Sequence, residues 1–313
     1  MRRPRLGHIQ FINCLPLYYG LVKNDVLLDV DLVKADPKDL AVQLVTGELD
    51  VAPIPAIEYA RHAHDLVLLP DIAISSDGEV QSILLLSKRP AEQLNGATVA
   101  LTNSSRTSQV LARILLAKRW GVDAAYVEMP PDLPAMMREA DAALLIGDDA
   151  LRAYWDKPAD LLEYDLGTEW TAWTGLPMVY AVWAARREFV AEQPEAAQAV
   201  VDSLGRSLTY CRAHLDDISD YAARWEPFPA EHFRSYFDAL QFRFDSRYRE
   251  GLTRYLTEAH GVRRYPFGEK GLLDLYCSER SSALEKPSIE VKSDVPLILE
   301  LSWEGGKEEI RLP

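Results

Sequence analysis

The sequence predicts an α/β fold with two lobes and a cleft between them, and three observations support this prediction. Short apolar stretches alternate with helical patterns over roughly the first ninety residues. A second alternation of the same kind begins after Lys88-Arg89-Pro90, and from Arg186 onward the pattern is mostly helical. Alternating elements of this length are typical of βαβ units around a mainly parallel sheet. The 313 residues are enough for two lobes with separate cores.

The first alternation contains a well-marked helix. Asp36-Pro37 places a favoured N-cap residue before a proline at the first helical position, and Gly47 stands where this helix would end. A shorter helix carrying Glu58 and Tyr59 is expected after the third strand. Strands of this lobe are expected at residues 6–12, 30–34, 50–54, 66–69 and 80–86.

The second alternation contains a strongly amphipathic helix that ends at Gly121. Its apolar residues recur three and four positions apart, as on the buried face of a surface helix: Val110, Leu111, Ile114 and Leu115. Further strands are expected at residues 97–101, 126–129, 142–146 and 178–183. Later helices are expected at residues 188–214 with a break at Pro194, at 230–240 and at 246–260.

This order of elements predicts that lobe two is inserted into lobe one. Residues 1–88 would form the first part of lobe one, 89–178 the inserted lobe two, and 179–280 the second, mostly helical part of lobe one. Crossing segments near 87–90 and 176–186 would form the hinge. Residues 281–313 contain two strand patterns around Gly305-Gly306, a favoured hairpin turn, so we expect an appendage with a β-hairpin and no catalytic role. Whether the appendage is an oligomer contact, and whether the protein is a monomer or a homodimer, the sequence leaves open.

Composition excludes several classes of function. The net charge of −14 disfavours nucleic acid as a partner, because phosphate binding needs clustered lysine and arginine. No apolar run reaches the roughly 18 residues that span a bilayer, and the basic start is not followed by the apolar core of a signal peptide. Three unpaired cysteines fit a reducing compartment. We therefore expect a cytoplasmic protein without a membrane partner.

The sequence also gives no sign of a metal, a cofactor or a hydrolase triad. His62 and His64 alternate on a polar segment without a third ligand at useful spacing. No nucleophile elbow of the Gly-x-Ser-x-Gly kind and no dinucleotide or phosphate-loop fingerprint is present. We expect neither a metal nor a cofactor, so any anion must be held by helix ends, hydroxyls and backbone N–H groups.

The run at residues 102–108 is the most informative, because a buried strand leads directly into hydroxyl residues at a helix start. Ser105, Thr107 and Ser108 would add donors to the unpaired N–H groups of that helix end, which suits a carboxylate. Ordinary N-capping explains one hydroxyl, but it does not explain several beside Arg106. We therefore favour an anion site here.

Other polar residues stand at strand ends, and each has a simple structural alternative. Asn13 follows the first strand and either points into the cleft or caps the next helix. Cys14 beside it is best explained as a packed small residue. Ser82 lies at the head of an apolar strand, an ordinary place for a polar residue. Gly147-Asp148 ends another strand, where capping of the following helix is an equal alternative.

Taken together, these segments resemble the chorismate dehydratases of menaquinone biosynthesis in the futalosine route. The resemblance runs from about residue 5 to 280. It implies a two-lobed periplasmic-binding-protein-like fold of type II and the conversion of chorismate to 3-[(1-carboxyvinyl)oxy]benzoate plus water. The matching segments are residues 12–17, 47–55 with Glu58-Tyr59, Ser82, Ser105 to Ser108, 147–150 and 173–177.

The resemblance also implies roles for particular residues. Asn13 and Ser82 would be catalytic, and the hydroxyl helix start would hold a carboxylate of chorismate. Backbone and side chains on both sides of the cleft would complete the substrate site: Pro53, Ile54, Pro55, Ala56, Ser105, Thr107, Ser108, Gly147 and Asp148. With no evident general base, our hypothesis is that the enolpyruvyl carboxylate of the substrate accepts the proton. Asp148 is the alternative base.

Two other functions remain compatible with the sequence. A 1,4-dihydroxy-6-naphthoate synthase of the same pathway would share the order of lobes. A non-catalytic intracellular protein that binds small anions would share the fold. The neighbourhoods of Asn13 and Ser82 would separate the naphthoate synthase from a chorismate dehydratase. Incubation of the protein with chorismate would separate all three functions.

Overall fold

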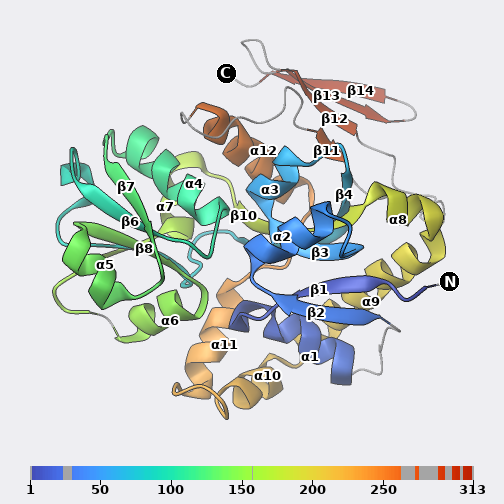
Figure 1. Ribbon diagram of the computed structural model, residues 1–313, viewed down its shortest axis with the longest axis horizontal. Helices are drawn as coiled ribbons and strands as arrows, with labels where there is room; N and C mark the ends of the chain where they lie inside the picture. Colours follow the sequence, from blue (N-terminus) through green and yellow to red (C-terminus); the bar gives the residue numbers. More distant parts are fainter. Residues whose placement is uncertain are drawn as a thin grey trace.

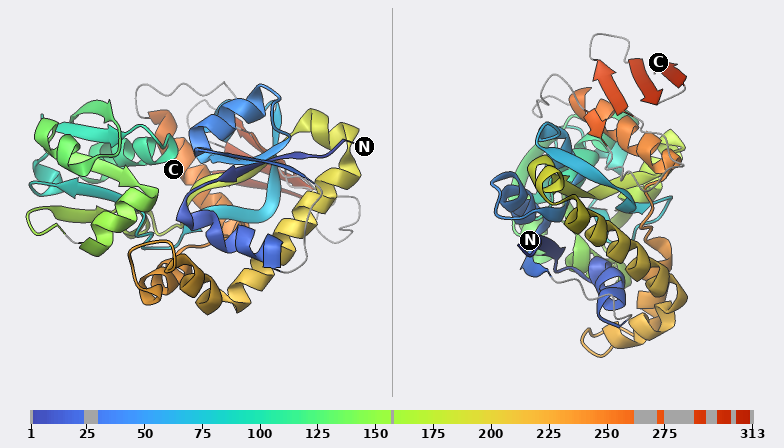
Figure 2. Two further views of the ribbon diagram at one scale, coloured as in Figure 1. Left: turned by 60° about the horizontal axis from the view of Figure 1, so that its bottom comes forward. Right: turned by 90° about the vertical axis from the view of Figure 1, so that its right-hand side faces the viewer.

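The computed structural model describes residues 2–23, 30–156 and 158–261, together with four strands between residues 272 and 311. Over these residues the chain forms two lobes, each built on a five-stranded sheet with helices against its faces (Figure 1). Lobe two lies beside lobe one, and the helices at residues 230–239 and 246–261 lie near the junction between them (Figures 1 and 2).

The sheet of lobe one has the order β2-β1-β3-β10-β4. Strand β1 is parallel to β2 and β3, whereas β10 is antiparallel to β3 and β4. β10 is buried along almost its whole length, as its continuous apolar sequence predicts. The strands are β1 (Arg5–Ile9), β2 (Asp31–Ala35), β3 (Val51–Pro55), β4 (Leu66–Ser76) and β10 (Met178–Arg186). The helices are α1 (Leu15–Lys23), α2 (Pro37–Val45), α3 (Ala56–Arg61), α8 (Arg187–Glu192) and α9 (Pro194–Ala213).

The sheet of lobe two has the order β7-β6-β8-β5-β9. Its strands are β5 (Ile83–Ser87), β6 (Thr98–Thr102), β7 (Ala125–Met129), β8 (Ala142–Ile146) and β9 (Leu162–Asp165). Its helices are α4 (Thr107–Ile114), which continues as a π-helical turn (Leu115–Arg119), α5 (Leu133–Glu139), α6 (Gly147–Asp156) and α7 (Leu166–Thr174).

The boundary predicted at residue 88 is wrong for β5. This strand pairs with β8 and β9 in lobe two, so the first crossing lies at residues 77–82 and not at 87–90. Every residue of β5 is buried. An apolar run predicts that a strand is buried, but it does not say which sheet buries it, and this is why the sequence misplaced the boundary.

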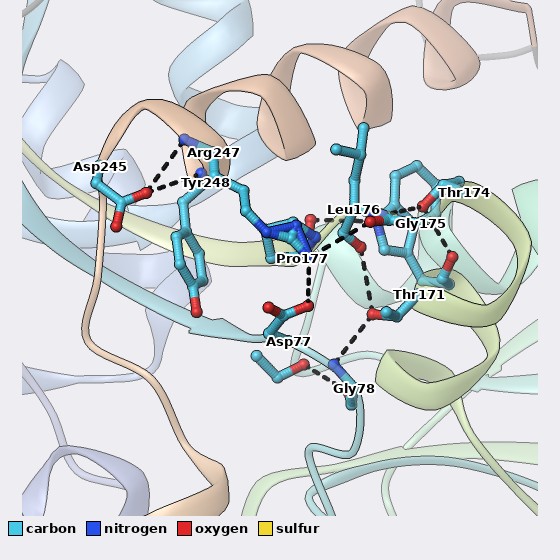
Figure 3. Close-up of polar contacts among 12 residues, drawn as sticks. Asp77, Gly78, Thr171, Thr174, Gly175, Leu176, Pro177, Asp245, Arg247 and Tyr248 are labelled. Carbon is cyan, nitrogen blue, oxygen red and sulfur yellow. Dashed lines mark hydrogen bonds and ion pairs between the residues drawn. The ribbon is translucent and has the colours of Figure 1, made fainter.

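Helix α12 (Ser246–Gly261) contacts both crossing segments where they lie side by side (Figure 3). The guanidinium of Arg247 donates to Asp77 Oδ1 of the first crossing at 3.0 Å and to the carbonyl oxygen of Gly175, at the start of the second, at 3.4 Å. Thr171 Oγ1 accepts from the N–H of Gly78 at 3.0 Å and donates to the carbonyl of Leu176 at 3.2 Å. The second crossing is shorter than the predicted range of 176–186, because β10 of lobe one already begins at Met178.

Helices α10 (Leu215–Ala222) and α11 (Ala230–Ala239) complete lobe one, and α11 also reaches lobe two. Trp155 of α6 packs edge-on against Phe228 and against Phe233 of α11, with ring centroids 4.6 and 5.2 Å apart. α12 reaches lobe two as well, because the Tyr255 hydroxyl donates to the carbonyl of Thr107 at the start of α4. Both late helices thus bridge the lobes.

The predicted hairpin near the C-terminus is present as β13 (Ile298–Trp303) and β14 (Gly306–Arg311), which pair antiparallel. It is not a lone hairpin, because β11 (Leu272–Asp274) and β12 (Ser288–Lys292) extend it to a sheet of the order β11-β12-β13-β14. The centre of its turn and the predicted start of the appendage at residue 281 lie outside the described residues.

Gly251 of α12 is required by the close approach of α12 to the second crossing. A Cβ at Gly251 would lie 2.1 Å from the carbonyl oxygen of Pro177. We expect Gly251→Ala to lower the free energy of unfolding by about 1–3 kcal/mol, the usual cost of overpacking, measured by urea denaturation. Gly205→Ala is the control, because a Cβ at Gly205 of α9 meets nothing within 4 Å. That variant should be as stable as the wild type or up to about 1 kcal/mol more stable. Equal stability of Gly251→Ala and the wild type would contradict this account of the α12 contact.

Candidate active site

A cavity between the lobes brings together several of the predicted site residues. Its volume is about 50 Å³, so the cavity is narrow in this structure. Its wall comes from both lobes and from the first crossing segment: Ile9, Phe11, Asn13, Pro37, Pro55, Ile74, Val80, Ser82, Ile83, Ser105, Ser108, Ile146, Gly147, Tyr180, Ala181 and Leu240. This wall contains no lysine, arginine, histidine, aspartate or glutamate, so its polar groups are neutral.

Asn13 lies in the 3-10 turn Ile12–Cys14 that joins β1 to α1. Its side-chain oxygen is buried and has no hydrogen-bond partner among the described residues. It therefore does not cap α1, which was the simple alternative. Burying an amide oxygen without a hydrogen-bond partner costs about 1–3 kcal/mol of folding free energy. This geometry therefore indicates that the Asn13 oxygen accepts a hydrogen bond from a ligand. Cys14 beside it is buried and free, and burial raises the pKa of its thiol, as expected for a packed residue.

Ser82 is held at the cavity by its backbone. The carboxylate of Asp165 accepts from the N–H groups of Val80 at 3.0 Å and Gln81 at 2.6 Å, and Gln81 adopts a left-handed conformation with φ of 60°. The carbonyl of Ser82 accepts from the N–H of Gly147, at 2.8 Å. The position of Ser82 is therefore set by two contacts: one with Gly147, where β8 meets α6, and one through its neighbours with Asp165, just before α7.

The hydroxyl of Ser82 contacts a tyrosine that the sequence did not single out. Tyr236 of α11 donates to Ser82 Oγ at 3.0 Å, and Ser82 Oγ donates to the carbonyl of Val80 at 3.3 Å. Tyr180 of β10 lines the cavity itself, with its hydroxyl 2.9 Å from Ser76 Oγ, whereas Tyr236 lies behind the wall. Tyr180 lies in the strand predicted at residues 178–183 and Tyr236 in the helix predicted at 230–240, and no local signal marks either tyrosine as belonging to the site.

The hydroxyl residues at the start of α4 have different roles: some cap the helix or contact α3, and some line the cavity. Ser105 and Ser108 line the cavity, and Ser105 Oγ also caps α4 by accepting from the Ser108 N–H at 3.2 Å. Thr107 is not part of the cavity wall, because its hydroxyl accepts from the N–H of Ile57 in α3 at 3.4 Å. Arg106 pairs with Glu128 on β7. Capping thus explains more of this run than we expected, and two serines remain for a ligand.

The remaining predicted residues separate into those at the cavity and those behind it. Pro55 lines the cavity, whereas Pro53, Ile54 and Ala56 are buried away from its wall. Gly147 lines it with φ of 62°, and a Cβ there would lie 3.4 Å from the ring of Phe11. Trp170 is fully buried and donates to the carbonyl of Pro177, so it packs in the core and is not part of the cavity wall.

Asp148 lies behind the cavity wall and binds the turn that carries Asn13. Its Oδ1 accepts from the N–H of Ile12 at 3.0 Å, which joins α6 of lobe two to lobe one. Burial raises the pKa of Asp148 to about 6, against the lowering effect of the Ile12 hydrogen bond, and the nearby charge of Glu226 adds to the rise. This carboxylate belongs to a different hollow, which His8, Lys34 and Trp225 also line.

Two searches over the described residues bear on metals and membranes. In residues 2–23, 30–156 and 158–261, no three or more His, Cys, Asp or Glu side chains gather as a set that could hold a metal ion. Within the part of the chain that the structure describes, no helix combines the length and the apolar character needed to cross a bilayer.

The sheet orders, the two crossings and the cavity between the lobes define the class of protein: a two-lobed periplasmic-binding-protein-like fold of type II. Solved structures of this fold are similar. A protein from Archaeoglobus fulgidus matches with a TM-score of 0.68 and 21% identity, covering 83% of this chain and 97% of that one. The periplasmic aliphatic sulphonate binding protein of Escherichia coli matches with a TM-score of 0.61 and 16% identity, covering 83% and 86%.

The chain belongs to the menaquinone biosynthesis family, whose profile matches residues 4–261. It is similar to the chorismate dehydratase of Thermus thermophilus, with 34% identity over 202 residues that cover 60% of this chain and 72% of that protein. It is also similar to the 1,4-dihydroxy-6-naphtoate synthase of the same organism, with 26% identity over 226 residues, 71% of this chain and 79% of that protein.

The raised pKa of Asp148 predicts a pH-dependent effect on stability. A carboxyl whose pKa rises from about 3.9 in the unfolded chain to about 6 on folding favours the folded state at low pH. This contribution is lost as pH rises through 6. Asp148→Asn keeps an acceptor for the Ile12 N–H and removes the titration. The stability of the wild type relative to Asp148→Asn should fall by about 1 kcal/mol between pH 5 and pH 8, measured by urea unfolding at both pH values. A difference that stays constant with pH would show that Asp148 does not titrate in this range.

Proposed function

We propose that this protein is a chorismate dehydratase, a carbon–oxygen lyase that converts chorismate to 3-[(1-carboxyvinyl)oxy]benzoate and water. The observation that carries the proposal is the cavity, which gathers Asn13, Ser82, Ser105 and Ser108 from separate parts of the chain and contains no strong acid or base. Membership of the menaquinone biosynthesis family and similarity to a chorismate dehydratase support it.

The reaction suits a site of neutral donors. The ring carbon that carries the enolpyruvyl ether loses its proton, and the neighbouring carbon loses its hydroxyl as water, so the ring becomes aromatic. Because aromatisation supplies the driving force, the protein must orient the dianion, exclude water and assist proton transfer. In our proposal Ser105 and Ser108, with the N-terminal N–H groups of α4, bind a carboxylate of the substrate.

Asn13 and Ser82 would contact the reacting part of the substrate. The buried oxygen of Asn13 can accept a hydrogen bond, and the Ser82 hydroxyl can donate one to the departing hydroxyl. The ring proton passes to the enolpyruvyl carboxylate of the substrate itself and from there to the departing hydroxyl group, which leaves as water. The position of Asp148 behind the wall supports this assignment over a protein base, because its Oδ1 is engaged with the Ile12 N–H.

The purified protein should consume chorismate, measured as loss of the diene absorbance, with the aromatic product identified by mass spectrometry. Asn13→Ala and Ser82→Ala should each lower kcat by about 10²-fold or more, the usual loss for a donor or acceptor used in a transition state. Ser75→Ala is the control, since Ser75 is also a buried serine that donates to a backbone carbonyl but stands outside the cavity wall. Full activity of both Asn13→Ala and Ser82→Ala would refute this site.

Asp148→Asn separates the two candidate bases. If the substrate carboxylate takes the proton, this variant should keep at least about one tenth of wild-type kcat, because Asn preserves the acceptor for Ile12. Loss of turnover by about 10³-fold or more with chorismate binding intact, measured by calorimetry, would instead identify Asp148 as the base.

The alternatives give different results in the same assay. A 1,4-dihydroxy-6-naphthoate synthase, favoured by the second relative, would leave chorismate unchanged. A binding protein without activity would bind chorismate in calorimetry and release it unaltered. A cytoplasmic location and the choice between monomer and homodimer stay predictions.

A further inference from the structure

Two buried hydroxyl groups from distant parts of the chain meet at the edge of the cavity. Ser82 is 3% exposed and Tyr236 is fully buried, and their oxygens are 3.0 Å apart although 154 positions separate them in sequence. Tyr236 is not part of the cavity wall. It therefore lies one residue behind the wall and touches a reacting group only through Ser82.

The hydrogen-bond pattern fixes which oxygen donates. The carbonyl of Val80 can only accept, so the Ser82 hydroxyl hydrogen points to it. The Tyr236 hydroxyl must then donate to Ser82 Oγ. With one lone pair used by Tyr236, the serine oxygen cannot rotate freely, and its own hydrogen has a restricted set of directions.

The hydrogen of Ser82 is held weakly and can be redirected. Its bond to the Val80 carbonyl is long, at 3.3 Å, and the same carbonyl already accepts the Ser82 N–H at 2.7 Å. Turning this hydrogen toward a ligand therefore leaves no carbonyl unsatisfied. A donor on Ser82 Oγ also strengthens the bond that Ser82 makes in turn, because hydrogen bonds in a chain polarise one another.

We infer that Tyr236 is a positioning residue for the dehydration, holding the Ser82 hydroxyl as a donor directed at the departing hydroxyl group of the substrate. This inference rests on the proposed function. Tyr236 does not supply the proton itself. Burial raises the pKa of Tyr236, the charge of Asp148 adds to this effect, and the Ser82 hydrogen bond opposes it. The tyrosine accordingly remains a neutral donor.

The helix that carries Tyr236 also contacts lobe two. α11 carries Tyr236 on one side and packs through Phe233 against Trp155 of lobe two. Ser82 belongs to the first crossing segment. The Tyr236–Ser82 bond therefore forms where α11, the crossing segment and lobe two meet.

The test compares Tyr236→Phe with Tyr18→Phe in steady-state turnover of chorismate. Tyr18 is the matched control, a buried tyrosine whose hydroxyl donates to the carbonyl of Gly7 away from the cavity wall. Tyr236→Phe should lower kcat about tenfold, the equivalent of one hydrogen bond, and change KM less than about threefold. Tyr18→Phe should leave kcat unchanged, even if it lowers the melting temperature as much as Tyr236→Phe does.

A double-variant comparison separates positioning from a structural effect. In a Ser82→Ala background, measured as single turnover with enzyme in excess, Tyr236→Phe should cause no further loss of rate. An equal loss in both backgrounds, or wild-type kcat for Tyr236→Phe, would overturn the inference. A wild-type protein that leaves chorismate unchanged would instead refute the proposed function, so the two failures are distinguishable.

Discussion

The carboxylate of Asp165 is the interaction on which the site depends. It accepts three backbone N–H groups, those of Val80, Gln81 and Thr168, and so joins the first crossing segment to the start of α7. Burial raises the pKa of Asp165, and these three hydrogen bonds oppose the rise. The strained left-handed conformation of Gln81 persists because this carboxylate binds the N–H of Gln81 itself and that of Val80 before it. Without it the crossing segment would not direct Ser82 to the cavity.

The late helices make the two lobes into one binding unit. Arg247 of α12 contacts both crossing segments, and Tyr236 of α11 contacts Ser82, although both residues follow the whole of lobe two in sequence. A cavity formed in this way can fix the positions of neutral polar side chains without a charged residue in its wall. The wall has no cationic side chain, so an anionic ligand must be bound by hydroxyls, an amide and a helix start. This arrangement agrees with a protein of net charge −14, whose general field would repel an anion.

Much of the fold could be predicted because local signals and burial agree. Pro37 begins α2 as its position after Asp36 predicted, the strand at 142–146 was found with its bounds, and Pro194 separates α8 from α9. The errors have a common cause. β5 was assigned to the wrong lobe and β9 was missed, because pairing partners are chosen by tertiary contacts and leave no local pattern.

For the site, the sequence determined which residues stand near strand ends and helix starts, because local patterns predict the elements that Asn13, Ser82, Ser105 and Gly147 flank. Which of them face one hollow was decided by the tertiary structure. The hydroxyl of Thr107 is turned to α3 and the carboxylate of Asp148 to the Ile12 N–H, while Tyr236 arrives from a helix far along the chain. The physical reason is that a cavity is formed by contacts between distant segments, whereas sequence patterns record the contacts that each segment makes with itself.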